Sequence, residues 1–260
     1  MEQRRIDQAA EFLWSAWQDR RLIEALPPES RPADLAEGYE VQRALGKLAG
    51  PTLGWKIAAT SVAGQRHIGV DGPLAGRLYS RYAHGAGISL PAGHLNMRVA
   101  EAEFAFRMGG GLPPRGRAYS QDEVMAAVAS LHLAIEVPDS RYRDFVKVGA
   151  PSLVADDACA GFWLRGEETN GWRDLDLAAH AVAARKNGAA AGTGSGANVL
   201  GDPRIALTWL ANDLNGRGDG LKPGELITTG TCVPPVTIAP GDRIEMDFGG
   251  LGTIEVSFRE

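Results

Sequence analysis

The chain has 260 residues, of which 44% are hydrophobic and 23% are charged, proportions of a folded globular protein rather than a disordered one. The net charge of -5 provides no basic surface for nucleic acid. Two cysteines without a CxxC spacing indicate neither a disulfide scaffold nor a thiolate metal site. The first residues are too polar for a signal peptide and no apolar run reaches the roughly 20 residues that span a bilayer, so we expect a cytoplasmic protein.

Two amphipathic helices are predicted at the start of the chain. Apolar residues recur at mostly three- and four-residue spacings from residue 5 to residue 25 and predict the first helix. The second runs from Leu35 to about Leu48 and ends at Gly50-Pro51. Because two helices bury too little surface to be stable alone, we expect residues 1–52 to form a helical cap on the remainder of the chain.

From residue 53 the sequence changes to short β-rich segments that are separated by Gly and Pro. This pattern predicts a β-rich domain over residues 53–260 that forms a single structural unit. Asn187-Gly188 is a strong signal for a type I′ hairpin between two of the strands. The candidate strands are Leu53–Ala58, Glu101–Met108, Leu131–Val137, Ala160–Leu164, Ala178–Lys186, Ala189–Ala191, Leu226–Thr229, Arg243–Phe248 and Gly252–Phe258.

Two helices interrupt the β-rich part. Ser120-Gln-Asp-Glu123 is a capping box, and it predicts a helix over Val124–Leu131. Asp202-Pro203 provides an N-cap followed by proline at the first helical position, and it opens a helix that runs to about Leu214. The chain is therefore expected to have an α+β fold, dominated by strands with a few helices packed outside.

Two of the predicted strands carry acidic residues on one face. Alternation over residues 100–106 places Glu101 and Glu103 on the face opposite to the apolar residues, and residues 131–137 repeat the pattern with Glu136. Acidic side chains that face an interior are costly unless they are paired or bind a metal. Oxygen ligands alone favour Mg²⁺ or Mn²⁺. The pattern thus predicts either a solvated acidic strand face or a site for a hard divalent cation.

Several short motifs follow one another in the order found in a known enzyme family. Each motif alone is weak, whereas the ordered set is specific, and it spans residues 35–258. The motifs are Gly54-Trp-Lys-Ile57, Thr60-Ser61, Ile68-Gly-Val-Asp-Gly-Pro73, Glu101-x-Glu103, Ala134-Ile-Glu-Val-Pro-Asp-Ser-Arg141, Val154-Ala-Asp156, Val199-Leu-Gly-Asp-Pro203, Thr229-Gly-Thr231 and Pro240-Gly-Asp242. The set resembles the 2-keto-4-pentenoate hydratase / 4-oxalocrotonate decarboxylase group of the fumarylacetoacetate hydrolase superfamily.

The resemblance implies a fold, a metal and a class of substrate. The fold would be a mixed β-sandwich or rolled barrel with an N-terminal helical cap. Glu101, Glu103 and Glu136 would hold Mg²⁺ or Mn²⁺, and a 2-oxo acid or 2-hydroxydienoic acid would chelate the metal through its carboxylate and 2-oxygen. Enzymes of this group usually form homo-oligomers, and some associate with another enzyme of their pathway.

The motifs also suggest roles for five further residues. Lys56 would be a catalytic or substrate-positioning base, with a pKa lowered by partial burial beside the metal; the alternative is an exposed strand lysine or a lysine that only pairs with a glutamate. Asp156 would contact the substrate or a water, or only cap its loop. Arg141 would anchor a substrate carboxylate or neutralise the acidic cluster. Thr229 and Thr231 would hold the substrate carboxylate or form a plain β-turn.

The expected reaction is hydration of a 2-hydroxypenta-2,4-dienoate-type substrate to a 4-hydroxy-2-oxo acid. Decarboxylation of 2-oxohex-3-enedioate, which is 4-oxalocrotonate, at the same kind of site is the alternative. A carbon–carbon hydrolase or oxaloacetate decarboxylase is disfavoured because the N-terminal segment lacks a Glu-His dyad. A non-catalytic partner subunit is disfavoured because the three glutamates and Lys56 are present.

Two segments depart from the pattern of the family. The family often has Asp-Asn-x-Ser where this chain has Asp156-Asp-Ala-Cys159, and the segment Thr231-Cys-Val-Pro-Pro235 is also unusual. Asp157 and Cys159 change the polar groups that would meet the substrate, and the two prolines would stiffen one wall of its pocket. The sequence therefore indicates the reaction type more closely than it indicates the substrate.

Overall fold

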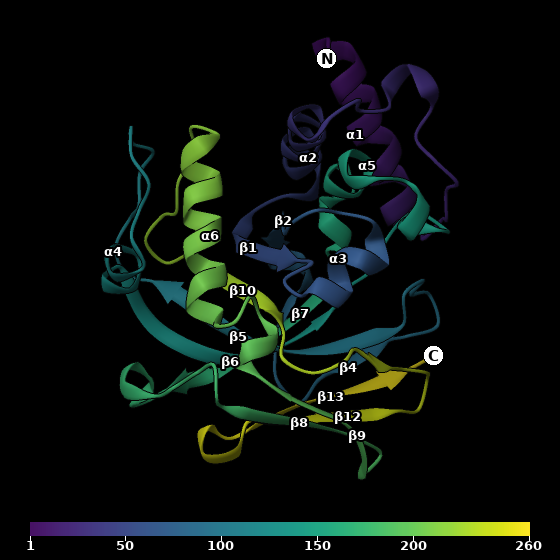
Figure 1. Ribbon diagram of the computed structural model, residues 1–260. Coiled ribbons are helices and arrows are strands. Elements are labelled where there is room, and N and C mark those ends of the chain that lie inside the picture. Colours follow the sequence, from purple (N-terminus) through teal and green to yellow (C-terminus); the bar gives the residue numbers. More distant parts are fainter.

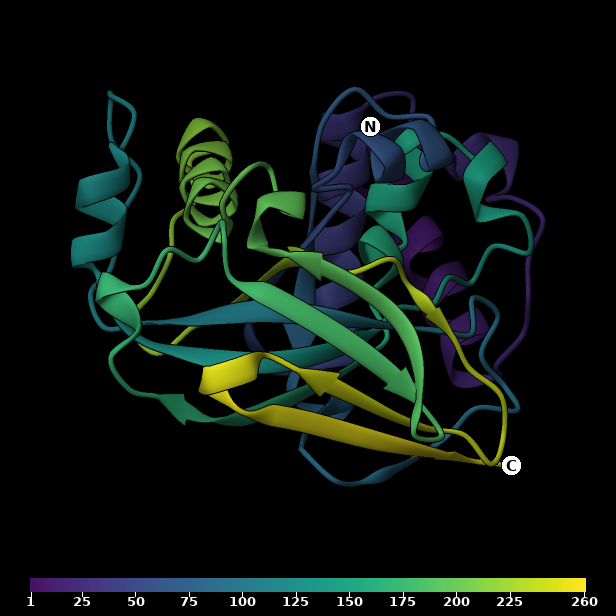
Figure 2. The ribbon, with the colours of Figure 1, turned by 60° about the horizontal axis from the view of Figure 1, so that its bottom comes forward.

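The computed structural model describes residues 1–260 as two β-sheets with helices gathered on one side of them (Figures 1 and 2). The larger sheet has the strand order β2-β1-β10-β5-β6-β7-β3, with β11 paired to β5, and it is strongly curled. The smaller sheet has the order β4-β13-β12-β8-β9 and lies below the larger one in Figure 1. This arrangement confirms the expected mixed β fold with helices at the N-terminus.

The strands and helices follow one another along the whole chain. The strands are β1 (Thr52–Ala58), β2 (Leu74–Tyr79), β3 (Ala83–Gly85), β4 (Ser89–Pro91), β5 (Val99–Met108), β6 (Val128–Val137), β7 (Phe162–Thr169), β8 (Ala181–Lys186), β9 (Ala189–Ser195), β10 (Leu226–Thr231), β11 (Val236–Thr237), β12 (Arg243–Asp247) and β13 (Thr253–Arg259). The α-helices are α1 (Gln3–Gln18), α2 (Leu35–Ala49), α3 (Val62–Ile68), α4 (Gln121–Ala126), α5 (Ala150–Ala155) and α6 (Pro203–Gly216). None of these helices is both long and apolar enough to cross a lipid bilayer.

Two of the predicted helices were too long. The first ends at Gln18, and Ile23 instead forms an isolated parallel bridge with Tyr142. The predicted capping box is confirmed, but its helix ends at Ala126, and Val128 already belongs to β6. In both places the chain makes tertiary hydrogen bonds that helical periodicity does not reveal.

The apolar faces of the central strands build the main core. Phe104 and Phe106 of β5 are fully buried, and the ring of Phe104 lies 5.1 Å from that of Phe248, which follows β12. Burial of each such ring contributes roughly 1.5–3 kcal/mol. Because alternate residues of a strand face opposite ways, this packing sends Glu101 and Glu103 to the other face of the larger sheet.

A second apolar cluster joins the N-terminal helices to the rest of the protein. Leu13 of α1 and Leu45 of α2 are fully buried in it, together with Tyr142 from the chain that follows β6 and Ala155 from α5. Figure 1 shows α1, α2 and α5 side by side above one end of the larger sheet. The segment around Tyr142, which follows the strand of Glu136, is thus held by the N-terminal helices.

Candidate metal and substrate site

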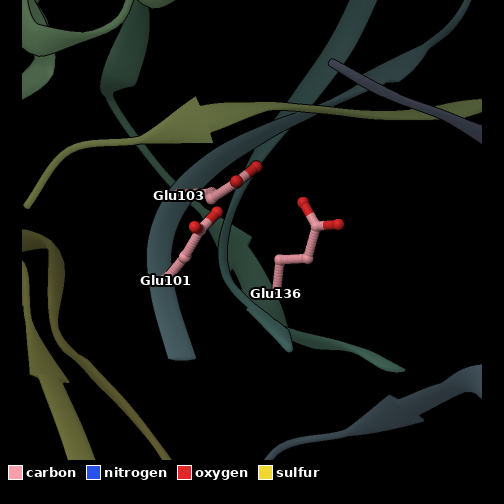
Figure 3. Close-up of side chains that lie close together, drawn as sticks. All are labelled: Glu101, Glu103 and Glu136. Atoms are coloured by element: carbon pink, nitrogen blue, oxygen red, sulfur yellow. The ribbon is translucent and has the colours of Figure 1, made fainter. Parts of the chain in front are cut away.

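Three glutamates from adjacent strands face a common space, as Figure 3 shows. In the antiparallel pair of β5 and β6, Glu101 lies directly opposite Glu136, and Glu103 follows two residues along the same face. Each contributes a carboxylate oxygen to a group whose members lie within 4.8 Å of one another. Glu103 and Glu136 are 0% and 2% exposed, which excludes a solvated strand face. We call Glu101, Glu103 and Glu136 the carboxylate cradle.

Strand β10 orients one carboxylate of the cradle. The Gly230 N–H donates to Glu103 Oε2 at 2.9 Å, and the Thr228 hydroxyl donates to the same oxygen. Gly230 has φ +111°, and a Cβ there would lie 1.8 Å from Thr60 Oγ1, so only glycine fits. Glu103 Oε1 is buried without a hydrogen-bond partner. A partnerless buried oxygen within an all-carboxylate set fits a hard divalent cation.

The charges of the cradle are incompletely compensated by the protein. Burial and the neighbouring Glu136 raise the pKa of Glu101 to about 7. Burial, Glu136 and Glu101 together raise the pKa of Glu103 well above its usual value. One cationic side chain contacts the cradle: Lys56 Nζ lies 3.0 Å from Glu136 Oε1. Because a bound cation favours the ionised carboxylates, a metal would relieve this repulsion.

Lys56 is held in place by two partners. It is 3% exposed, and besides Glu136 its Nζ donates to the Ala158 carbonyl at 2.9 Å. Burial alone would lower the pKa of Lys56, but the carboxylates of Glu136 and then Glu101 outweigh burial and raise it. In the protein alone the pKa of Lys56 is therefore raised, and the lowered pKa that the sequence predicts for the metal-loaded site stays a prediction.

A cavity of about 600 Å³ opens beside the cradle. Of the residues singled out in the sequence, Lys56, Glu101 and Thr231 line it. Its charged or imidazole-bearing lining residues are Lys56, Glu101 and His67. Most of the remaining wall is apolar and comes from β1, β2, α3, α5 and the loops beside them: Ile57, Ile68, Leu74, Phe145, Leu153 and Val233.

Arg141 and Asp156 lie outside the lining of this cavity and bind one another. Arg141 Nε donates to Asp156 Oδ1 at 2.5 Å, and the Arg141 backbone N–H and the Ser140 hydroxyl donate to Oδ2 at 3.0 and 2.7 Å. Thr229 is also away from the cavity, because its hydroxyl donates to the Phe104 carbonyl at 2.8 Å.

The sequence analysis missed several groups that shape this site. Thr228 and the backbone of Gly230 orient Glu103, and the Ala158 carbonyl holds Lys56. The Thr-Gly-Thr motif was the available signal for Gly230, since a glycine between threonines marks a special backbone position. A backbone carbonyl such as that of Ala158 leaves no mark in the sequence.

Comparison with known proteins agrees with the fold. The model of the family "Fumarylacetoacetate (FAA) hydrolase C-terminal" matches residues 75–259. The 2-hydroxyhexa-2,4-dienoate hydratase of Comamonas testosteroni is 33% identical over 98% of each chain. A 4-oxalocrotonate decarboxylase of Pseudomonas putida is 33% identical over 80% of this chain and 78% of that protein.

A solved structure is similar over nearly the whole chain. The 4-oxalocrotonate decarboxylase from Pseudomonas putida G7, complexed with magnesium and adipate, has a TM-score of 0.89 and 29% identity, and covers 99% of this chain and 98% of its own. A second structure of that enzyme holds calcium and acetate.

The relatives that cover most of the chain are hydratases and a decarboxylase, and they show that the protein is an enzyme of the hydratase or decarboxylase kind. The chain belongs to the fumarylacetoacetate hydrolase family. The group indicated by the ordered motifs, that of the 2-keto-4-pentenoate hydratases and 4-oxalocrotonate decarboxylases, is thereby confirmed.

Proposed function

We propose that the protein hydrates 2-hydroxydienoic acids of the 2-hydroxypenta-2,4-dienoate type, with Mg²⁺ or Mn²⁺ held by the carboxylate cradle. The observation that carries this proposal is the wall of the cavity. Apart from Lys56, which is already paired with Glu136, no lysine or arginine lines it. A monocarboxylate with a hydrocarbon tail suits such a wall, because the tail needs apolar contacts and no counter-charge.

A dicarboxylic substrate suits the same wall poorly. Decarboxylation of 2-oxohex-3-enedioate would bring a second carboxylate into a cavity whose lining has no lysine or arginine besides Lys56. An ionised group in apolar surroundings is costly without a cation or several N–H donors. The similarity to a decarboxylase keeps that reaction as the second candidate, and an apolar pocket would also favour loss of a poorly solvated carboxylate.

The net reaction adds one water to the diene. A proton joins carbon 5, a hydroxyl joins carbon 4, a second proton joins carbon 3, and the proton on the 2-hydroxyl is lost. A divalent cation on the cradle would supply Lewis acidity at the 2-oxygen. Lys56 lines the cavity, and its Nζ lies 3.0 Å from Glu136 of the cradle, so we assign it the proton transfers to and from the substrate.

The other site residues take supporting roles in this proposal. Thr231 lines the cavity and is proposed to contact the substrate carboxylate. Thr229 supports β10 through its hydrogen bond to Phe104 and so keeps Gly230 in position. We assign Asp156 and Arg141 no contact with the substrate, because the Asp156 carboxylate already accepts hydrogen bonds from the backbone N–H and the guanidinium of Arg141.

Two substrates distinguish the candidate reactions. Ultraviolet absorbance would follow 2-hydroxypenta-2,4-dienoate and 2-oxohex-3-enedioate with and without Mg²⁺. We expect Mg²⁺-dependent loss of the first only, and loss of the second only would establish the decarboxylase instead. Glu101→Gln should abolish the Mg²⁺-dependent turnover, whereas the matched change Glu168→Gln, on the exposed face of β7, should leave it intact. Unchanged turnover in Glu101→Gln would refute the cradle as the metal site.

A further inference from the structure

We propose that Arg141 is a positioning residue for the hydration reaction, because it clamps the turn whose carbonyl holds Lys56. The inference rests on the proposed function for its kinetic consequence. Its structural part, the clamp itself, concerns contacts outside the cradle and the cavity. The turn is strained, Arg141 bridges its two ends, and the carbonyl of Ala158 within the turn contacts Lys56.

The turn over Asp157–Cys159 has an unusual backbone. Asp157, Ala158 and Cys159 have φ of +56°, +50° and +61°. Residues other than glycine seldom adopt positive φ, and three in succession persist only where the surroundings impose them. Two hydrogen bonds inside the turn help, from Cys159 N–H to the Asp156 carbonyl and from Ala160 N–H to the Asp157 carbonyl. Neither is enough to make this conformation favourable for ordinary side chains.

Arg141 binds both ends of this turn. One terminal nitrogen of its guanidinium donates to the Asp156 carbonyl at 2.6 Å, immediately before the turn. The other donates to the Ala160 carbonyl at 2.8 Å, immediately after it. Nε donates to the Asp156 carboxylate, so each of the three guanidinium nitrogens has a hydrogen-bond partner. Arg141 is 4% exposed, which shields these bonds from water.

The clamped turn delivers one of the two contacts of Lys56. The Ala158 carbonyl accepts from Lys56 Nζ at 2.9 Å, while Glu136 is the other partner. Without the turn, the ammonium would keep only the carboxylate that belongs to the cradle. Its position relative to a substrate in the cavity would then be set by one bond instead of two.

The N-terminal helix reaches this clamp from outside. The guanidinium carbon of Arg141 lies 3.9 Å from the ring centroid of Trp17 in α1, and Trp17 also stacks on Tyr82. Strand β2 also holds the turn, because the backbone N–H of Arg77 donates to Asp157 Oδ1 at 2.7 Å. Helix α1, remote from the cavity in sequence, is thereby connected to Lys56 through Trp17, Arg141 and the turn.

Arg141→Lys tests the clamp while it keeps the charge opposite Asp156. A lysine ammonium cannot reach two carbonyls and a carboxylate at once, as a guanidinium fork does. We expect kcat to fall by at least about tenfold, because the proton-transfer group is misplaced. KM and the Mg²⁺ dissociation constant should stay within about twofold, because Arg141 touches neither the cavity nor the cradle.

The matched control is Arg143→Lys, two residues along the chain. The Arg143 side chain is 60% exposed and pairs with the exposed Glu24. The kcat and KM of Arg143→Lys should therefore equal those of the wild type. Hydrogen exchange followed by mass spectrometry gives a readout that is independent of turnover. The amides of Cys159 and Ala160 should exchange faster in Arg141→Lys than in Arg143→Lys.

A second substitution separates positioning from loss of structure. Glycine adopts positive φ without strain, so Ala158→Gly in the Arg141→Lys background should restore part of the lost kcat while it keeps the carbonyl. Wild-type kcat in Arg141→Lys would overturn the proposal. So would a joint loss of kcat, Mg²⁺ affinity and thermal stability that Ala158→Gly does not reverse. If the wild type fails to turn over the dienoate, the proposed function is refuted, and the exchange of the turn amides still decides the clamp.

Discussion

Two buried groups of charges lie on either side of the turn over Asp157–Cys159, and they differ in how completely they are compensated. In the Arg141–Asp156 pair, both carboxylate oxygens of Asp156 accept hydrogen bonds, and the guanidinium donates to two carbonyls as well. In the carboxylate cradle, three acidic residues share one lysine, and Glu103 Oε1 has no partner.

The difference separates an ion pair whose hydrogen bonds are made within the protein from a cluster that still has an oxygen free for a ligand. A buried ion pair with every hydrogen bond made contributes to the specificity of the fold, and it has no capacity left for a ligand. A buried cluster with an unpartnered oxygen and raised pKa values is unfavourable until something positive binds. Both groups contain the residue types of catalytic sites, so their contacts distinguish them and their composition does not.

The largest effect on stability is expected from the compensated pair. Arg141→Met removes the partner of a buried carboxylate and should lower the free energy of unfolding by about 3–5 kcal/mol. Urea unfolding followed by circular dichroism would measure the loss. Arg143→Met, at an exposed position, is the control and should change stability by less than about 0.5 kcal/mol. A loss below 1 kcal/mol at Arg141 would contradict the contrast.

In the cradle, removal of a buried charge should raise the free energy of unfolding instead of lowering it. Glu103→Gln removes one uncompensated charge and should lower Mg²⁺-dependent turnover by at least about 100-fold, through loss of a metal ligand. In the presence of a chelator it should also stabilise the protein. The pKa of Glu103 is raised by folding, so its ionised form opposes folding increasingly as the pH rises above about 4.3, the value of the unfolded chain.

Chemical unfolding in EDTA at pH 5 and pH 8 would check the sign. We expect the stabilisation by Glu103→Gln to be larger at pH 8 than at pH 5. Glu168→Gln should show neither effect, because the Glu168 side chain is 54% exposed. A variant that is destabilised at both pH values would mean that the protein itself compensates the cradle.

Asp157 provides an intermediate case. Burial raises its pKa to about 8, although Oδ1 accepts from the Arg77 N–H, and Oδ2 is buried without a partner. The pKa of an aspartate in the unfolded chain is about 3.9. Asp157 therefore lowers the free energy of unfolding progressively as the pH rises from about 4 to 8. Asp157→Asn should therefore raise the free energy of unfolding by about 1–3 kcal/mol at pH 7 and by less at pH 4. Thermal midpoints at the two pH values would show whether the gain is pH-dependent.

The smallest effect concerns the apolar wall beside the cradle. Saturated 2-oxo acids of increasing length should inhibit the metal-loaded enzyme about fourfold better for each added CH₂, the equivalent of about 0.8 kcal/mol. At equal chain length, 2-oxoadipate should inhibit at least about tenfold more weakly than 2-oxohexanoate. Phe145→Lys would supply a cation at the wall and should improve inhibition by 2-oxoadipate. Equal inhibition by both acids of the wild type would favour the decarboxylase.

Sequence periodicity predicted the parts of the fold that depend on local alternation. The alternating residues of β5 and β6 placed Glu101, Glu103 and Glu136 on one face, and the structure shows Glu103 and Glu136 buried and Glu101 partly buried. The Asn187-Gly188 hairpin is confirmed between β8 and β9, with positive φ at both residues. Strand β2 was missed, although it is nearly all buried, because Leu74–Tyr79 contains too little alternation to mark a strand.

The pairing of Arg141 with Asp156 is a contact that the sequence does not reveal. Both residues stand in motifs of the family, and an arginine or an aspartate in such a motif suggests contact with the substrate. Fifteen residues separate them, and nothing in the sequence states that they pair. The same holds for Lys56, whose pKa depends on how many of the surrounding carboxylates lie within reach.

By itself, the sequence determined the family, the face on which the three glutamates lie and the oxygen chemistry of the site they form. These follow from residue order and from the two-residue period of a strand, both of which are local. The tertiary structure alone decided which buried charges compensate one another, that the Ala158 carbonyl meets Lys56, and that the cavity wall lacks a further cation. Those are contacts between residues distant in the chain, several through backbone atoms that every residue shares, so they depend on packing rather than on residue type.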